Sequence, residues 1–306
     1  MCTENLIMCS INTYKKLVKL LTNFISIVSI RLPDDVLNAL KELAKNEENP
    51  YGKFIYDAMF KNINLAISKN IPLCQDTGIP QFYVKLGENF PFKSLLLKAL
   101  NEATSIATKR SFLRPNVVDP FNNENTGNNI GLHMPWIELE LIPDVDYTEI
   151  TLYLAGGGSS KPGVAKVFDP TIKWKSIIKF ILHNIVKYGS SICPPLLIGV
   201  GIGPTIEIAA SLSKKAILRP IGSKNLNSKA AILETLLKNL VNKLGIGPQG
   251  LGGTTTIMDA HIEYAGRHPA TLAVAISTSC WALRRGTLKI HQNLCYEVLN
   301  YTGVTI

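Results

Sequence analysis

The chain has 306 residues, of which 46% are hydrophobic and 18% are charged, a composition that is typical of a folded protein and excludes a disordered or low-complexity one. A chain of this length can bury about three quarters of its surface, so one large or two small domains can form without disulfides or structural metals. The formal net charge of +9 favours anionic ligands, but the basic residues are scattered with no run of five, so we expect no nucleic-acid partner.

The N-terminal segment carries the most hydrophobic stretch of the chain. Residues 17–30 are interrupted by Lys19 and Asn23, so they fall short of the roughly 18 uninterrupted apolar residues that a membrane span needs. Their apolar positions follow helical spacing, which predicts an amphipathic helix and not an export signal. We therefore expect a cytoplasmic protein with no membrane partner, and an N-terminal extension, residues 1–14, that frays.

Helical periodicity continues through the first third of the chain. A helix is predicted to begin after Pro33 and Asp34 and to place Val36, Leu40 and Leu43 on one face. Two more helices are predicted over residues 53–68 and 93–109.

A period of two residues replaces the helical one further along. Ile137, Leu139 and Leu141 alternate with Trp136, Glu138 and Glu140. This alternation predicts a strand with one buried face. Further strands are predicted at 82–86, 150–154, 196–200, 257–264 and 272–276, and helices at 175–188, 206–213 and 229–244. The mixture predicts a mixed α/β fold in which a helical N-terminal layer packs on a mixed β-sheet core. Since neither a repeat nor a linker divides the sequence, we expect a single catalytic domain, residues 1–306.

Six cysteines occur, at positions 2, 9, 74, 193, 280 and 295, and none forms a CxxC pair, so zinc-ribbon and thioredoxin-like sites are excluded. Without an export signal, thiols or metal ligands are favoured over disulfides. Cys74, Cys193 and Cys280 lie in polar, Gly- or Pro-rich segments at the ends of predicted elements. Any one of them could be a small buried hydrophobic residue, but the three together indicate a site.

Glycine-rich segments at 156–161, 199–204 and 247–253 could offer backbone N–H groups to an anion. None has the spacing of a nucleotide-binding motif, so a small-anion site remains open and a nucleotide site is disfavoured. Asp76 lies two residues after Cys74, and His268 precedes Cys280 by 12 residues. The sequence alone leaves open whether His268 is structural or catalytic. The absence of a Ser-His-Asp order and of HExxH gives a hydrolase little support.

Six segments carry a family resemblance. In order and spacing they resemble the alpha subunit of the class I (iron-sulfur) fumarase and L(+)-tartrate dehydratase family, from about Lys15 onward: PLCQDTG, AGGG, SICPPLLIGVGIG, KKAILRPIGS, LGIGPQGLGG and CWALRRGTL. The resemblance implies the N-terminal, alpha-subunit domain of that family and a hydro-lyase activity on a 2-hydroxy dicarboxylate.

The resemblance also implies a cofactor. Members of the family hold a 4Fe-4S cluster by three cysteine thiolates, and the matching positions are Cys74, Cys193 and Cys280. Three ligands for four irons leave one iron open as a Lewis acid.

Further site residues follow from the same resemblance. Asp76 and His268 match catalytic positions, with Asp76 a candidate for proton transfer at the substrate hydroxyl. Gln75 matches a hydrogen-bonding residue, Arg114 a substrate-carboxylate arginine, and Gly157 a backbone contact in the triple-glycine turn. Negative charge builds up during water elimination, so an open iron, an arginine and a nearby acid all stabilise the transition state.

A second domain found in single-chain members of the family is missing from this sequence. Two-chain members carry it on a beta subunit, so the resemblance implies a partner beta subunit, an α2β2 heterotetramer, and cluster binding without turnover by the alpha chain alone.

The substrate expected from the resemblance is L(+)-tartrate, which would be converted to oxaloacetate. Features such as the Asn125-Thr126-Gly127 turn favour tartrate over fumarate or malate, whereas Ser159-Ser160-Lys161 departs from the Cys-Thr-Leu associated with tartrate enzymes. Two alternatives remain: a two-chain fumarate hydratase, and an iron-sulfur binding or regulatory protein that has lost turnover.

Overall fold

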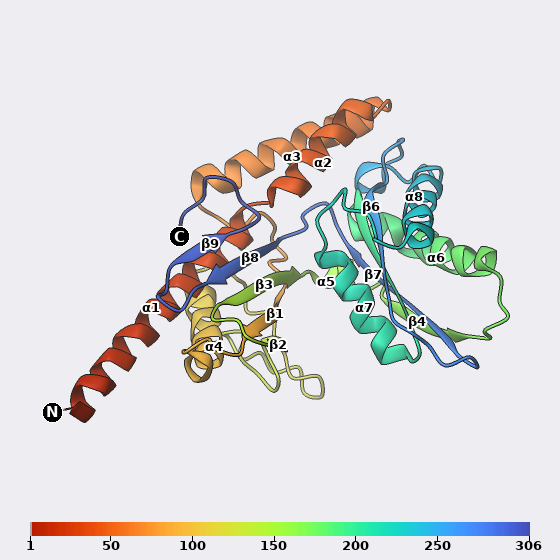
Figure 1. Ribbon diagram of the computed structural model, residues 1–306. Helices are drawn as coiled ribbons and strands as arrows, with labels where there is room; N and C mark the ends of the chain where they lie inside the picture. Colours follow the sequence, from red (N-terminus) through yellow and green to blue (C-terminus); the bar gives the residue numbers. More distant parts are fainter. Residues whose placement is uncertain (1) are drawn as a thin grey trace. The chain divides into compact units, whose positions relative to one another are not determined.

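The computed structural model describes residues 2–306, with side chains from Ile11 onward (Figure 1). The chain divides into two compact units. Unit 1 consists of Met1–Asp34, Ile63–Ala155 and Arg284–Ile306, and unit 2 consists of Asp35–Asn62 and Gly156–Leu283. The chain thus passes between the units several times, which explains why no linker is visible in the sequence.

Unit 1 is built on a five-stranded sheet with the order β2-β1-β3-β8-β9. Its strands are β1 (Ile79–Gly87), β2 (Trp136–Ile142), β3 (Thr148–Ala155), β8 (Arg285–Ile290) and β9 (Tyr296–Val298). β1 runs parallel to β2, and the other neighbours are antiparallel. The C-terminal segment therefore completes a sheet that begins with residues 79–87.

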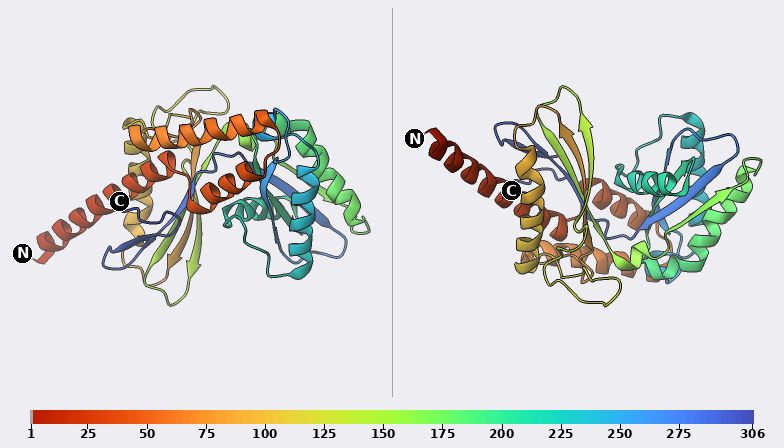
Figure 2. Two further views of the ribbon diagram at one scale, coloured as in Figure 1. Left: turned by 90° about the horizontal axis from the view of Figure 1, so that it is seen from above. Right: turned by 90° about the horizontal axis from the view of Figure 1, so that it is seen from below.

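Two helices of unit 1, α1 (Cys2–Ile30) and α4 (Lys93–Lys109), cover one face of this sheet (Figure 2). Phe24 and Val28 of α1 are fully buried against Phe82 and Leu152 of the sheet. The predicted amphipathic character of residues 17–30 is confirmed, because the apolar face of α1 supplies a large part of this core. Residues 1–10, most of the extension predicted to fray, lie outside the part of the chain whose side chains are described.

The strand predicted at residues 136–141 forms, but its expected buried face is exposed. β2 was expected to bury the face that carries Leu139 and Leu141, but these side chains are 49% and 61% exposed. The reason is the extent of the core: β2 is an edge strand, and of its residues only Ile137 packs against the core of this sheet, so alternation of apolar residues does not ensure a covered face.

Unit 2 contains a four-stranded sheet with the order β4-β7-β5-β6. Its strands are β4 (Val164–Phe168), β5 (Leu196–Gly203), β6 (Ile257–Tyr264) and β7 (Leu272–Ser279). β5 is parallel to β6 and antiparallel to β7. With the five-stranded sheet, this confirms the predicted mixed α/β class; β4, β8 and β9 are strands that the sequence patterns missed.

Helices cover both faces of this second sheet. α6 (Trp174–Tyr188) and α8 (Ser228–Asn242) share a core with the large apolar residues of β5, β6 and β7. α7 (Ile206–Leu218) packs closely on the other face, where a Cβ at Gly201 would lie 1.8 Å from the Ala209 carbonyl oxygen. The GVGIG segment is therefore explained by close helix packing on a strand, because a side chain at Gly201 would displace α7.

α2 (Asp34–Asn46) and α3 (Pro50–Lys69) precede the first strand, and their junction is anchored inside unit 2. The carboxylate of Glu47, only 1% exposed, accepts hydrogen bonds from the amides of Thr254 (3.0 Å) and Thr255 (3.0 Å). Burial opposes ionisation of Glu47, but these hydrogen bonds outweigh it and lower the pKa of Glu47. The segment after the glycine-rich 247–253 loop is thus held by a buried charge.

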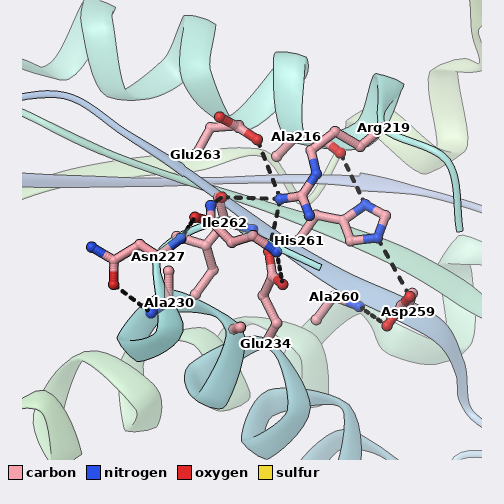
Figure 3. A network of polar contacts seen from close by, with 12 residues as sticks. Ala216, Arg219, Asn227, Ala230, Glu234, Asp259, Ala260, His261, Ile262 and Glu263 are labelled. Atoms are coloured by element: carbon pink, nitrogen blue, oxygen red, sulfur yellow. Dashed lines mark hydrogen bonds and ion pairs between the residues drawn. The ribbon is translucent and has the colours of Figure 1, made fainter. Parts of the chain in front are cut away.

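A buried polar network explains the KKAILRPIGS segment (Figure 3). Arg219 donates to Glu234 (2.8 Å), to the Ile262 carbonyl (3.2 Å) and to Glu263 (3.2 Å). Glu234 is fully buried and also accepts from the amides of Asn225 (3.0 Å) and Ile262 (2.9 Å). The loop after α7 is therefore attached to α8 and β6 by charge-assisted hydrogen bonds.

Replacing Glu234 by alanine is expected to lower the free energy of unfolding by about 3–5 kcal/mol, because it leaves the Arg219 charge largely buried without its main counter-charge. Urea denaturation of the two proteins measures the change. The control is Glu42→Ala, which removes an ion pair to Lys45 whose side chains are 65% and 70% exposed, and which should cost less than about 1 kcal/mol. Equal losses in the two variants would contradict this account of the network.

Asp259 is the second charged centre of the same region (Figure 3), and it is 1% exposed. Burial alone would raise its pKa, but contacts with His261 (3.4 Å), Lys238 (3.6 Å) and the Gly222 amide (2.8 Å) outweigh burial and hold the pKa of Asp259 well below its ordinary value. A carboxyl whose pKa is lower in the folded state stabilises the fold above its unfolded pKa, and this stabilisation is lost as the pH falls through the folded-state pKa.

We therefore expect the free energy of unfolding to fall less steeply between about pH 6 and pH 3 in Asp259→Asn than in the unchanged protein. Urea denaturation at several pH values measures the slope. Asp57→Asn, at an exposed position of α3, serves as the control and should keep the original slope. An unchanged slope in Asp259→Asn would show that this carboxyl does not link folding to pH.

No helix in the described part of the chain is long and apolar enough to cross a membrane.

Candidate functional site

The first predicted ligand, Cys74, lies in the turn between α3 and β1 in unit 1. The turn is attached to α1 by a hydrogen bond from the Leu73 amide to the Ser29 carbonyl (3.1 Å). Asp76 Oδ1 accepts from the Gly78 amide (3.0 Å), which closes the turn immediately before β1 begins. Cys74 and Asp76 are half-buried and Gln75 is exposed, so the thiol, the carboxyl and the carboxamide are offered by one short, fixed segment.

A buried arginine hydrogen-bonds to the backbone of this turn. The Arg284 guanidinium donates to the Asp76 carbonyl oxygen (2.6 Å), and Arg284 is only 2% exposed. Arg284 immediately precedes β8, and its carbonyl accepts from the Leu154 amide of β3 (3.0 Å), which fixes its position. The CWALRRGTL segment thus contributes an arginine that holds the backbone of the Asp76 turn.

The Arg114 loop is fastened to the same turn. The Arg114 amide donates to Thr77 Oγ1 (2.8 Å), and Asn116 Nδ2 donates to the Gly78 carbonyl (3.1 Å). Fully buried Asn129 accepts from the Asn116 amide (2.8 Å) and donates to the Arg114 carbonyl (2.8 Å). The structure therefore brings Asp76 and Arg114 to one place in unit 1, with the Arg114 residue exposed.

The sequence patterns missed Thr77, Asn116, Asn129 and Arg284 as supporting residues. Thr77 and Arg284 lie inside quoted family segments, so proximity to Cys74 and Cys280 was an available signal. Asn116 and Asn129 carry no such signal, since an asparagine in a loop reads only as a turn former.

The second and third predicted ligands meet in unit 2. β5 and β7 are antiparallel, and Leu197 is paired with Ser279, so the start of β5 lies beside the end of β7. Cys193 precedes β5 and Cys280 follows β7, and the Trp281 amide donates to the Cys193 carbonyl (3.2 Å). Two thiol-bearing turns that are 87 positions apart in the numbering (280 − 193) are therefore adjacent.

The triple-glycine turn lies at the same edge of this sheet. Gly157 begins the short helix α5 (Gly157–Ser160), and Thr278 Oγ1 donates to the Ser159 carbonyl (2.6 Å) two residues before Cys280. Gly157 is exposed. Unit 2 thus brings three predicted site residues, Gly157, Cys193 and Cys280, to one edge.

His268 lies elsewhere in unit 2. It is exposed in the loop between β6 and β7, where its Nδ1 accepts from the Ala270 amide (3.1 Å). This loop precedes β7, whereas Cys280 follows it, so an eight-residue strand on the order of 25 Å long separates the two positions. The structure does not bring His268 beside the cysteine pair.

The donor chemistry fits an iron-sulfur centre. Cys74, Cys193 and Cys280 are thiols, Cys193 being exposed and the other two half-buried, and thiolates are the ligands that iron-sulfur clusters use. Across the described residues no three His, Cys, Asp or Glu side chains gather as a metal-binding group. Cys74 belongs to unit 1, whereas Cys193 and Cys280 form a pair in unit 2.

Comparison with known proteins defines the class. Residues 18–289 match the family model described as fumarate hydratase (Fumerase). The chain belongs to this family, which confirms both the resemblance and the expectation of a hydro-lyase.

Particular relatives are similar over nearly the whole chain. L(+)-tartrate dehydratase subunit alpha of Escherichia coli K12 is 48% identical over 287 residues, which cover 94% of this chain and 95% of the relative. The protein of the same name from Shigella sonnei matches with the same identity and coverage. A protein of Methanocaldococcus jannaschii is 39% identical over 265 residues, covering 86% of this chain and 93% of the relative.

Proposed function

We propose that this chain is the alpha subunit of an iron-sulfur hydro-lyase that removes water from L(+)-tartrate to give oxaloacetate. The observation that carries the proposal is the 48% identity over 94% of the chain to alpha subunits named for that reaction. The adjacent turns of Cys193 and Cys280 support it, because two thiols held by paired strands form part of a preorganised ligand set.

Cys74, Cys193 and Cys280 would hold a 4Fe-4S cluster in this proposal. When bound, the cluster supplies an electron-poor iron that polarises the substrate hydroxyl as a Lewis acid. The three thiols must be thiolates to bind it, so cluster loading releases protons and depends on pH.

The remaining steps fall to side chains of the chain itself. Asp76 transfers a proton at the substrate hydroxyl, which departs as water. Gln75 donates a hydrogen bond to the substrate, and the planar guanidinium of Arg114 binds a substrate carboxylate. The Gly157 amide contacts the substrate through the backbone. The hydrogen bonds of Asn116 and Arg284 hold the backbone of the Asp76 turn in place, which limits the entropy lost when the substrate is positioned.

His268 remains a proposed substrate-side catalytic residue. Its exposed position before β7 means that the assignment depends on the family resemblance and not on contacts in unit 2.

A beta subunit is the proposed partner, in an α2β2 heterotetramer that supplies the remaining substrate-binding groups. The relatives are named as alpha subunits, which supports a two-chain enzyme. The net charge of +9 favours attraction of a dianionic substrate to the assembly.

The experiment is anaerobic purification of the chain together with its beta partner, followed by assays with L(+)-tartrate, malate and fumarate. Oxaloacetate formation from tartrate, at a kcat/KM well above that for malate, supports the proposal. Preference for malate or fumarate assigns the chain to a two-chain fumarate hydratase instead. A loaded cluster with no turnover of any of the three acids shows an iron-sulfur protein that has lost the reaction.

A further inference from the structure

We propose that Gln249 is a positioning residue of the Cys193 site, held in a strained backbone conformation so that its side chain remains available at that turn. Its effect on a bound cluster rests on the proposed function. Its effect on the thiol in the metal-free chain does not.

The first observation is a direct link between the loops. Gln249 belongs to the short helix η2 (Pro248–Gly250), and its amide donates to the Pro194 carbonyl (2.9 Å), one residue after Cys193. The Cys193 carbonyl accepts from Trp281 (3.2 Å), so the cysteine turn is held on one side by the Gln249 loop and on the other by the Cys280 loop. The Gln249 amide therefore hydrogen-bonds directly to the turn that carries Cys193.

The second observation is the backbone conformation. Gln249 has φ 54° and ψ 15°, in the left-handed region that a glutamine side chain disfavours. Its neighbours Gly247 (φ 69°) and Gly250 (φ 75°) share positive φ, and a Cβ there would lie 2.1 Å from Gly252 and 2.8 Å from Ser190. Glycine thus occupies the neighbouring positive-φ positions, whereas position 249 carries a long side chain at a cost in stability.

The third observation concerns the side chain itself. Gln249 is half-buried, and within the described part of the chain its carboxamide makes no hydrogen bond, so the side chain does not compensate for the backbone strain by stabilising the loop. A carboxamide offers both a donor and an acceptor, so an unbonded carboxamide on a loop that contacts the Cys193 turn is able to bind a polar partner there. A strained residue maintained beside candidate ligands is typical of functional sites, where the surrounding structure holds it in place.

Two substitutions separate the backbone from the side chain. Gln249→Gly removes the strain and the carboxamide, and should raise the Tm by about 2–4 °C. Gln249→Ala removes the carboxamide but keeps a Cβ in the left-handed region. Ser111→Gly, at an exposed position of unit 1 with φ 64°, is the matched control for relief of strain, and should raise the Tm without affecting the cysteine site.

Three quantities are measured: the Tm, the alkylation rate of Cys193, and the electron paramagnetic resonance spectrum of the loaded complex after one-electron reduction with dithionite. Alkylation of the metal-free chain by iodoacetamide is followed by peptide mass spectrometry. We expect both Gln249 variants to change the Cys193 alkylation rate at least threefold and to alter the spectrum, while Ser111→Gly changes neither. The proposal is overturned if Gln249→Ala and Gln249→Gly both keep the original alkylation rate and spectrum. If the unchanged complex takes up no cluster, the proposed function fails, and the alkylation rates still decide the role of Gln249.

Discussion

Cys193→Ser should give a complex that contains almost no iron or sulfide, in place of about four of each per alpha chain, and that shows no turnover. Serine keeps the size of the side chain and can occupy the left-handed turn at position 193 (φ 57°) about as readily as cysteine, so the fold should survive. Its hydroxyl is a poor ligand for iron because it remains protonated near neutral pH. Iron and sulfide analysis and visible absorbance of the anaerobically purified complex measure the loss.

The control for this substitution is Cys295→Ser. Cys295 is also an exposed thiol, but it lies in unit 1 near the C-terminus and outside the proposed ligand set. This variant should retain its iron, its spectrum and its turnover. If Cys193→Ser retained a full complement of iron, Cys193 could not be a ligand, and the 4Fe-4S assignment would need a different third thiol.

Asp76→Asn is expected to keep the cluster and to lower kcat by about 10²–10⁴-fold. The carboxyl of Asp76 closes its own turn through Oδ1, which accepts from the Gly78 amide (3.0 Å). An asparagine carbonyl oxygen can accept the same hydrogen bond, so the turn and its thiol should stay in place while the proton-exchanging group is lost. Steady-state kinetics, together with iron analysis of the same sample, separate the two effects.

Asp76→Ala provides the comparison. It removes the acid and also the hydrogen bond to Gly78, so it should reduce cluster loading as well as turnover. A fully active Asp76→Asn complex would show that another group exchanges the proton. Reduced iron in Asp76→Asn, equal to that in Asp76→Ala, would instead assign Asp76 a purely structural role.

Cys193→Ser and Asp76→Asn test different parts of the site. Cys193 tests whether the turns joined by β5 and β7 form part of a ligand set. Asp76 tests whether the turn before β1, held by Arg284 and Thr77, presents an acid to the substrate. A failure at one residue therefore leaves the other prediction standing.

Local sequence patterns were reliable wherever one periodicity governed one element. The helices predicted at 93–109 and 206–213 coincide with α4 and with the first part of α7, because their buried faces recur every three or four residues. β8 was missed because its alternation is short: only two large apolar residues, Leu288 and Ile290, mark the buried phase of this six-residue strand. Burial of Arg285, 2% exposed, is a tertiary feature that residue type does not predict.

The glycine segments show how one pattern can have several physical causes. Gly201 permits close approach of α7 to β5, whereas Gly247 takes a positive φ in a tight loop. Both were considered as anion-binding backbone from the sequence. Only the packing around each glycine distinguishes a steric requirement from an available N–H group.

The sequence by itself determined the mixed α/β class, the family and the candidate thiols, because each depends on short segments whose residue types and spacing are visible in one dimension. The tertiary structure decided which candidates share a location: strand pairing joins Cys193 to Cys280, and hydrogen bonds through Asn129 and Thr77 join Arg114 to Asp76. It also separated His268 from the cysteine pair. The physical reason is that strand order and loop packing arise from contacts between distant segments, which local periodicity does not encode.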